Sequence, residues 1–232
     1  MRRRCGFRYE KKLRATGVAR IAGIDEVGRG ALAGPVVAAA VVLPEKFRHR
    51  RLNDSKQLAP ELREEIYSEL VHNPEVRWTV GMIDSTEIDR INILRASHRA
   101  MRLAITALIE PPEHVLIDGL PVIPFPLPQT AIVDGDCISL SIAAASVIAK
   151  VTRDRMMRDF CVQFPQYCFA QHKGYGTELH LLRLHEFGPC PIHRRSFEPV
   201  AQPLLALEDI VQIRSSPTRR AGRDVGVSLS QA

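Results

Sequence analysis

The sequence lacks the cysteine pattern that builds disulfide frameworks or thiolate metal sites. It contains five cysteines, an odd number, and no two of them form a C-x-x-C pair. A disulfide framework uses cysteines in pairs and a thiolate zinc site uses such short spacings, so neither is expected. Reduced thiols are the rule in cytoplasmic proteins, and we therefore expect a cytoplasmic location.

Long hydrophobic segments are also missing. The longest apolar run, residues 31–43, is too short to span a bilayer and contains Gly34 and Pro35. The first residues are basic, but no apolar stretch follows them as it does in a secretory signal peptide. These absences predict a soluble protein without a membrane partner.

The overall composition is that of a soluble globular protein. Of the 232 residues, 45% are hydrophobic and 25% are charged, which excludes collagen-like, coiled-coil and wholly disordered chains. A chain of this length buries roughly 70% of its unfolded surface and needs no disulfide or metal to hold its core. We expect one folded domain over residues 18–209, a basic arm over residues 1–17, and a disordered tail over residues 210–232.

The net charge of +6 is unevenly distributed. Residues 1–20 contain eight basic residues and one acidic residue, whereas residues 21–200 contain 20 basic and 22 acidic residues. A basic arm favours a polyanionic partner, because Lys and Arg displace counterions from phosphates. The same charge would also serve solubility alone.

Strands and helices alternate in the predicted secondary structure. Strands are expected over residues 18–27, 36–43, 78–83, 114–117 and 130–133, and helices over residues 60–71, 84–108 in two pieces, 139–160 and 178–186. Too few residues separate the first two strands for a parallel crossover, so these strands must be antiparallel neighbours. The pattern predicts an α/β domain with a mixed sheet.

Acidic residues end three of the predicted strands: Asp25-Glu26, Asp118, and either Asp134 or Asp136. Ligands of open α/β sheets gather at the carboxyl ends of strands. Asp25 lies within an apolar run, where an unpaired carboxylate would cost several kcal/mol. Converging carboxylates suit Mg²⁺ or Mn²⁺. The alternative is that each acid simply begins a turn, as Asp-Gly pairs commonly do.

The glycines of residues 23–34 match two phosphate-binding patterns only in part. Residues 23–29 have P-loop glycine spacing but lack its Lys and its Ser or Thr. Residues 28–33 match a relaxed dinucleotide pattern, but the β-branched residues that follow predict a strand where that motif requires a helix. The glycines still allow a phosphate or sugar to approach the backbone closely.

Taken in order, a set of short motifs resembles ribonuclease HII, the type 2 ribonuclease H that cuts the RNA strand of RNA–DNA hybrids. The motifs are AGIDEVGRG at 22–30, AGPV at 33–36, NDSK at 53–56, LIDG at 116–119, GD at 135–136, SIAAASVIAKVTRD at 141–154 and QHKGYGT at 171–177. The resemblance runs from about residue 18 to residue 200.

The resemblance implies a ribonuclease H-like mixed five-stranded sheet flanked by helices, with a C-terminal helical extension. It also implies cleavage 5′ to ribonucleotides, including single ones in duplex DNA. For such a reaction, two divalent ions, Mg²⁺ or Mn²⁺, can activate the attacking water and stabilise the leaving 3′-oxygen. We expect Asp25, Glu26 and Asp118 to be direct ligands, and Asp136 to be either a ligand or a residue that positions the second ion. The products would carry 5′-phosphate and 3′-hydroxyl ends. The four site acids of the family fall on Asp25, Glu26, Asp118 and Asp136, its Gly-Arg-Gly motif on Gly28, Arg29 and Gly30, and its substrate-sensing tyrosine on Tyr175.

Two residues depart from the family pattern. Asp134 stands where a basic residue often precedes Gly-Asp, and Cys137 stands where Ser is common. An extra acid there could weaken the binding of phosphate or bind a metal ion.

We expect a monomeric protein.

Several further side chains are candidates for contacts with the nucleic acid. For Tyr175 the alternative is a packed aromatic beside Phe164 and Phe169. The candidate phosphate contacts are Lys56, Lys150, Arg153 and Lys173, and a solvated surface role fits each of them equally well. Arg194 and Arg195 are weaker candidates for contact with the duplex. Of the histidines, only His172, beside Lys173, suggests a role.

Two other functions fit parts of the pattern. One is a metal-dependent phosphoryl-transfer enzyme of the same fold with a different substrate. The other is a nucleic-acid-binding module without catalysis, driven by the basic arm. Asp25, Glu26 and Asp118 argue against the second, because a pure binder gains nothing from carboxylates beside phosphates.

Overall fold

The computed structural model describes residues 5–52, 55 and 57–201. The predicted phosphate contact Lys56 and the predicted tail, residues 210–232, lie outside the described residues.

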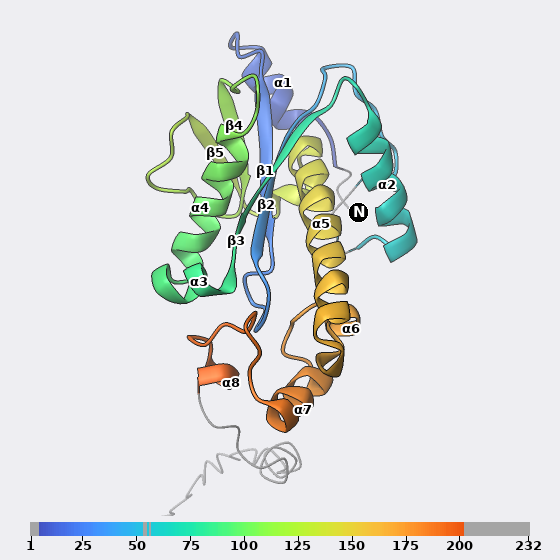
Figure 1. The fold of residues 1–232 in the computed structure, drawn as a ribbon. Helices are drawn as coiled ribbons and strands as arrows, with labels where there is room; N and C mark the ends of the chain where they lie inside the picture. Colours follow the sequence, from blue (N-terminus) through green and yellow to red (C-terminus); the bar gives the residue numbers. More distant parts are fainter. Residues whose placement is uncertain (1–4, 53–54, 56, 202–232) are drawn as a thin grey trace, which may run out of the picture.

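The core of the protein is one mixed five-stranded sheet of order β3-β2-β1-β4-β5 (Figure 1). β1 is antiparallel to β2 and β2 to β3, whereas β4 runs parallel to both β1 and β5. The predicted antiparallel pairing of the first two strands is therefore confirmed. The strands are β1 (Ile21–Val27), β2 (Val36–Val42), β3 (Arg77–Ile83), β4 (His114–Asp118) and β5 (Gln129–Ile132).

Helices cover both faces of this sheet. The long α5 and α2 lie on one face and α3 with α4 on the other, while α6 to α8 extend beyond the sheet where β1 ends (Figure 1). The small side chains of β2, VVAAAVV, are buried on both faces and allow helices to pack closely against either one. The helices are α1 (Arg8–Arg14), α2 (Pro60–His72), α3 (Ser85–Ile91), α4 (Ile93–Thr106), α5 (Leu140–Gln163), α6 (Phe169–His172), α7 (Glu178–Phe187) and α8 (Glu198–Ala201).

Local sequence explains where the helices begin. The predicted division of residues 84–108 is confirmed: Asp84 caps α3 and Asn92, at φ 68°, ends α3 and caps α4. Ser139 caps α5 by accepting a hydrogen bond from the amide of Ile142. Gly23 of β1 allows α5 to approach the sheet, because a Cβ at this position would overlap the backbone of Ser141.

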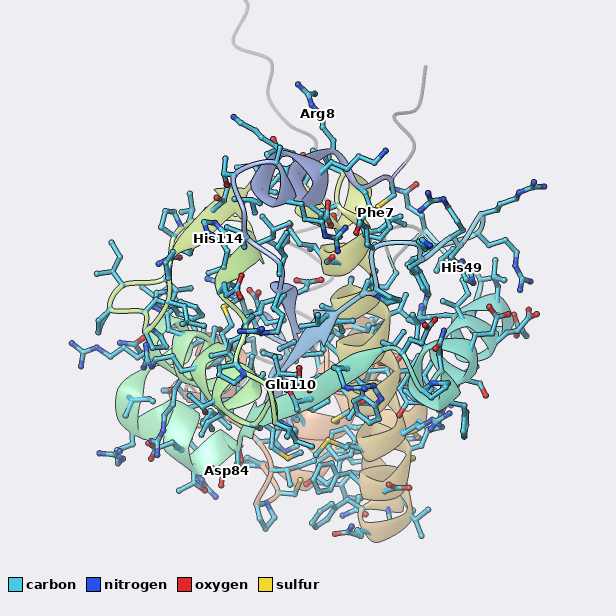
Figure 2. All side chains as sticks on the ribbon, turned by 90° about the horizontal axis from the view of Figure 1, so that it is seen from above. Phe7, Arg8, His49, Asp84, Glu110 and His114 are labelled. Carbon is cyan, nitrogen blue, oxygen red and sulfur yellow. The ribbon has the colours of Figure 1, made fainter. Side chains whose placement is uncertain are left out.

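The basic N-terminal segment is built into the fold from residue 5 onward. α1 covers residues 8–14, Phe7 belongs to the core beside α5, and Glu10 is completely buried. Arg8 projects outward from the same helix (Figure 2). Over its described residues, the predicted arm is therefore a packed helix with an exposed basic surface.

In the described part of the chain, no helix is both long enough and apolar enough to cross a membrane.

Candidate active site

Three carboxylates from distant parts of the chain converge at one end of the sheet. Asp25 lies near the end of β1, Asp118 ends β4, and Asp136 lies in the 3₁₀ turn Gly135–Cys137 after β5. One carboxylate oxygen of each lies within 4.8 Å of the others. Ile24 pairs with Ile117 in the parallel ladder, so the two aspartates that follow are neighbours. The structure thus brings these residues together as predicted.

The environment of Asp25 disfavours its ionised form. Its side chain is only 6% exposed, and burial, then the charges of Glu26 and Asp118, raise its pKa well above the usual range. Its Oδ1 accepts a hydrogen bond of 2.7 Å from the amide of Glu26, and a hydrogen bond with Ser146 acts in the opposite direction. A bound cation would offset both the burial and the mutual repulsion of the carboxylates.

Glu26 lies beside the three aspartates and is not one of the converging group. Its Oε1 forms an ion pair of 3.0 Å with Arg29. Burial raises the pKa of Glu26, and the hydrogen bond and charge of Arg29 oppose that shift. Of the four predicted acids, the structure therefore brings three together and holds the fourth against the Gly-Arg-Gly loop.

The turn after β5 decides between Asp134 and Asp136. Asp134 is exposed and has a left-handed conformation, φ 54°, whereas Asp136 is buried at 5% exposure. The amide of Gly135 donates a hydrogen bond of 2.7 Å to Oδ1 of Asp118. This turn therefore directs Asp136 into the site and joins it to Asp118, leaving Asp134 outside.

Two buried arginines hold the loop that follows β1. Arg194 donates to the carbonyls of Gly28 at 2.6 Å and Arg29 at 2.9 Å. Arg153 donates to the carbonyls of Pro35 at 2.8 Å, Ala33 at 3.0 Å and Lys173 at 2.9 Å. Gly28 has φ 91°, and a Cβ there would overlap the Arg153 side chain.

The prediction of a phosphate contact is wrong for Arg153, and Arg194 is likewise unable to touch a duplex. Both side chains are 0% exposed, and their guanidinium groups are bound by backbone carbonyls. Burial and the charge of Arg153 lower the pKa of Arg194 to about 9. These two arginines hold the loop in place through its backbone carbonyls. The sequence alone does not distinguish such a buried structural arginine from one that binds phosphate.

Tyr175 lies beside the Gly-Arg-Gly loop. It forms an antiparallel bridge with Ala31, and the Arg153 guanidinium carbon lies 5.5 Å from the centroid of its ring. The alternative placement beside Phe164 and Phe169 does not hold, since those rings form a separate cluster around Tyr167. The structure thus places Tyr175 next to the loop whose backbone a ligand could approach.

Three buried histidines support the segment that carries Tyr175. His180 Nδ1 donates to the Tyr175 carbonyl at 3.0 Å, and its Nε2 accepts from His193 Nε2 at 3.0 Å. His193 Nδ1 accepts from the amide of Cys190, which fixes its tautomer. Burial is the main cause that lowers the pKa of both His180 and His193 to about 4. His172 is also buried, with Nε2 donating to the Tyr167 carbonyl.

The described lysines among the predicted phosphate contacts lie near one another. Lys150 forms an ion pair of 2.7 Å with Asp154, and Lys173 donates to the carbonyl of Ala170. Burial lowers the pKa of Lys173, and the charge of Lys150 acts in the same direction. Both side chains are partly exposed and stay candidates for contact with a phosphate.

Sequence reasoning missed Ser146 and Glu10. Ser146 hydrogen-bonds Asp25, and its hydroxyl lies 2.8 Å from that of Ser55. The signal was a single hydroxyl within the Ala-rich stretch of residues 142–149. Glu10 is the single acidic residue of the basic segment 1–20, and such a setting is typical of an exposed side chain.

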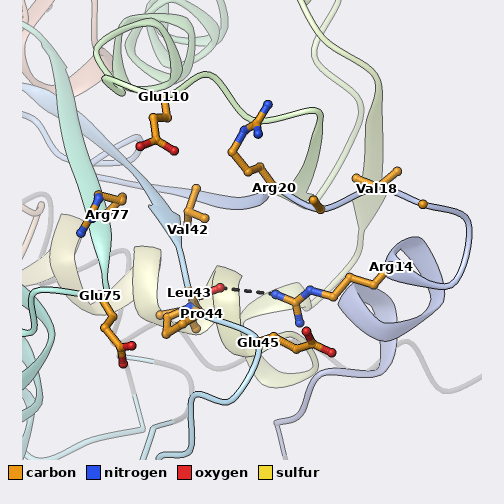
Figure 3. A pocket seen from close by; sticks show the side chains of 12 residues that line it. Arg14, Val18, Arg20, Val42, Leu43, Pro44, Glu45, Glu75, Arg77 and Glu110 are labelled. Carbon is orange, nitrogen blue, oxygen red and sulfur yellow. Dashed lines mark hydrogen bonds between the residues drawn. The ribbon is translucent and has the colours of Figure 1, made fainter.

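A pocket of about 530 Å³ lies at the opposite end of β1 (Figure 3). Arg14, Arg20 and Arg77 alternate there with Glu45, Glu75 and Glu110, and Arg14 donates to the Leu43 carbonyl. This pocket does not include the carboxylate group, because Arg20 precedes β1 and Asp25 lies near its end. It is therefore separate from the candidate active site.

A mixed sheet whose adjacent strand ends present converging carboxylates defines a metal-dependent phosphoryl-transfer enzyme, a class that includes nucleases. The sequence model of the family described as Ribonuclease HII matches residues 22–200. The ribonuclease HII of Geobacillus kaustophilus is 52% identical over 204 residues, covering 88% of this chain and 78% of that protein.

Solved structures agree with this match. The ribonuclease HII in a complex with PCNA from Archaeoglobus fulgidus has a TM-score of 0.67 and 26% identity, covering 82% of this chain and 99% of that chain. Bst-RNase HIII in complex with Mn²⁺ has a TM-score of 0.60 and 18% identity, covering 79% and 68%, and this likeness supports the fold alone.

The chain belongs to the ribonuclease HII family and has the expected ribonuclease H-like fold. It is an endoribonuclease that acts on the RNA of RNA–DNA hybrids, in a family that uses divalent metal ions.

Proposed function

We propose that this enzyme also incises duplex DNA on the 5′ side of embedded ribonucleotides, including single ones, and leaves 5′-phosphate and 3′-hydroxyl ends. The observation that carries the proposal is the convergence of Asp25, Asp118 and Asp136 beside a glycine loop that is open to a ligand. The carboxylates supply the hydrolytic centre and the loop supplies a place to read the sugar.

The donor set fits two Mg²⁺ or Mn²⁺ ions. Oxygen ligands from carboxylates are those that hard divalent cations prefer. Burial and the negative charges of Glu26 and Asp118 raise the pKa of Asp25, and a bound cation would offset both causes. We propose Asp25, Glu26, Asp118 and Asp136 as the residues that hold them. Two bound ions would acidify the attacking water and stabilise the leaving 3′-oxygen.

The Gly-Arg-Gly loop is the proposed reader of the 2′-hydroxyl. RNA differs from DNA at that group, so a contact with it is needed for discrimination. A Cβ at Gly30 would meet nothing within 4 Å, so the space beside this backbone is open. Arg194 fixes the carbonyls of Gly28 and Arg29, which keeps the loop rigid before substrate arrives.

Tyr175 is the proposed sensor of the RNA-to-DNA junction. Its backbone is bridged to Ala31, which directly follows the Gly-Arg-Gly loop. This neighbourhood supports a contact between its ring and the nucleotide that follows the ribonucleotide. Stacking of an aromatic ring on the following deoxyribose would favour a junction over uniform RNA. Replacing Tyr175 by Ala should therefore reduce the preference for a junction more than it reduces cleavage of long hybrids.

Positive charge outside the site would hold the nucleic acid backbone. Lys150 and Lys173 are the proposed phosphate contacts on the described body, and Lys56 is a further one. Arg8, Lys11 and Lys12 are exposed on α1 and would add salt-dependent affinity. We further propose that the enzyme acts in the cytoplasm, in keeping with its five free thiols, and that it acts as a monomer.

The test is incision of a DNA duplex that contains one ribonucleotide, with Mg²⁺ or Mn²⁺ present. We expect a cut on the 5′ side of the ribonucleotide, loss of cutting when its 2′-hydroxyl is replaced by hydrogen, and loss in Asp25→Asn. Cutting that survives removal of the 2′-hydroxyl would contradict the proposed substrate. Cutting that survives Asp25→Asn would contradict the proposed centre.

A further inference from the structure

The segment before the family match is joined to the turn that carries Asp136. The amide of Gly6 donates to the Ile138 carbonyl at 3.0 Å, and the amide of Leu140 donates to the Gly6 carbonyl at 3.2 Å. These bonds form a parallel bridge between Gly6 and Ser139. Phe7 packs in the same core cluster as Leu140. The start of α5 is therefore held from both sides, by the sheet and by this N-terminal segment.

Glu10 makes the decisive contact of this segment. Its Oε1 accepts hydrogen bonds from the Ser139 hydroxyl at 2.6 Å and from the Ser141 amide at 3.2 Å. A carboxylate at a helix N-terminus satisfies amides that lack partners within the helix and interacts favourably with the helix dipole. Glu10 thus fixes both the capping residue of α5 and the first turn of that helix.

The burial of Glu10 is not explained by stability alone. Its side chain is 0% exposed, and among the described residues its Oε2 has no hydrogen-bond partner. Burying a carboxylate with one oxygen unpaired is costly. Departures from full polar satisfaction concentrate at functional sites, where position matters more than stability.

A short chain of contacts connects Glu10 to the active site. The amide of Ser139 donates to the Gly135 carbonyl at 2.8 Å, closing the turn that contains Asp136. The amide of Gly135 in turn binds Oδ1 of Asp118. A shift of Ser139 would therefore move the Asp136 turn relative to Asp118 and Asp25.

We propose that Glu10 is a positioning residue that holds Asp136 in register with Asp25 and Asp118 through Ser139 and the first turn of α5. This inference rests on the proposed role of Asp136 in holding a metal ion. It gives the N-terminal helix a part in the active site beyond the electrostatic attraction of its basic side chains.

The test variant is Glu10→Gln, which keeps an acceptor of similar shape and removes the charge. Titration of Mn²⁺ into the full chain by calorimetry should show ion affinity reduced about fivefold or more. Hydrogen exchange should show faster exchange of the amides of residues 135–142. On an RNA–DNA hybrid, kcat should fall about fivefold or more while KM stays within about twofold of the original value.

The matched control is Glu75→Gln, which removes an exposed carboxylate at the opposite end of the sheet. It should leave ion affinity, exchange at residues 135–142 and kcat unchanged. Ser139→Ala is a second test variant, since it removes the hydroxyl that donates to Glu10 and so weakens the same contact. Combining Glu10→Gln with Ser139→Ala should then add little to the effect of either one.

The Asp136→Asn variant separates this inference from the function on which it depends. If Asp136→Asn loses ion affinity and Glu10→Gln does not, the inference is overturned and the proposed function stands. If Asp136→Asn binds Mn²⁺ as the original enzyme does, the proposed role of Asp136 fails and the inference fails with it. A lower melting temperature in Glu10→Gln with unchanged ion affinity and kcat would show a purely structural role and would also overturn it.

Discussion

Two glycines of the same loop show how a single residue can serve either the fold or the substrate. Gly28 has a positive φ, and its Cα faces the Arg153 side chain so closely that a Cβ would overlap it. Gly30 has open space where its Cβ would be and no such conformational demand. Gly28 is therefore required by the folded protein itself, whereas Gly30 keeps free a space that a ribonucleotide would occupy.

Alanine at these two positions should produce opposite results. Gly30→Ala should change the free energy of unfolding by no more than about 0.5 kcal/mol, as at other unconstrained surface positions. It should nevertheless lower kcat/KM on a single-ribonucleotide duplex by about tenfold or more. Gly28→Ala should cost about 1–3 kcal/mol of stability because of its backbone strain. Denaturant unfolding and cleavage assays check both; full activity in Gly30→Ala would refute its role.

Three buried charged side chains, those of Asp25, Arg153 and Glu10, show what the sequence predicts at the scale of single residues. Asp25 was predictable because a carboxylate inside an apolar run needs a partner. Arg153 was predicted to meet phosphate, but its partners are carbonyls of residues 33, 35 and 173, which only the folded chain brings together. Glu10 was missed for the same reason, since its partners lie about 130 residues away.

At the scale of elements, the C-terminal helices are tied to the Tyr175 segment by neutral histidines. His180 of α7 and His193 of the following loop share a hydrogen bond between their Nε2 atoms, which requires a proton on Nε2 of His193 and none on Nε2 of His180. A proton added to His180 would place two N–H groups against each other across this bond, and a proton added to His193 would place its Nδ1–H against the amide of Cys190. Both rings are buried against the aromatic rings of Tyr167 and Phe169. Neutral rings tolerate this burial, and none of the hydrogen bonds described above joins either ring to a carboxylate.

This histidine pair should make the fold sensitive to acid. The pKa of each is about 4 when folded and about 6.5 when unfolded, so the unfolded state binds more protons between these values. Stability should therefore fall as pH decreases from about 6.5 to about 4, by about 1 kcal/mol per histidine already at pH 5.5. Unfolding curves across this range test it. His193→Gln should flatten the dependence, and the exposed His185→Gln should not.

The element boundaries were largely predictable, because capping residues and hydrophobic periodicity are local. The division of α3 from α4 at Asn92 and the run of α5 were both indicated by the sequence. The docking of α1 was not, since its basic residues suggest a solvated arm while the contacts of Phe7 and Glu10 are with α5. The strand order placed three aspartates together, which the strand-end pattern had anticipated.

At the scale of the whole molecule, the net charge of +6 does not describe the candidate active site. That site is acidic, and its affinity for phosphate would come from the ions that we propose its carboxylates hold. The basic side chains of α1 lie on a helix that is packed onto the body near the Asp136 turn. The proposed attraction of nucleic acid and the proposed positioning of Asp136 would thus both reside in this N-terminal helix.

The most direct test of this account is the affinity of the enzyme for Mn²⁺, measured by calorimetry without nucleic acid. Asp25→Asn should lower that affinity at least tenfold, because it removes a charge from the converging group. Asp134→Asn should leave the affinity unchanged, since Asp134 is exposed and lies outside that group, and Asn also adopts its left-handed conformation. Equal affinity in the original enzyme and in Asp25→Asn would contradict the claim that these carboxylates hold the ions.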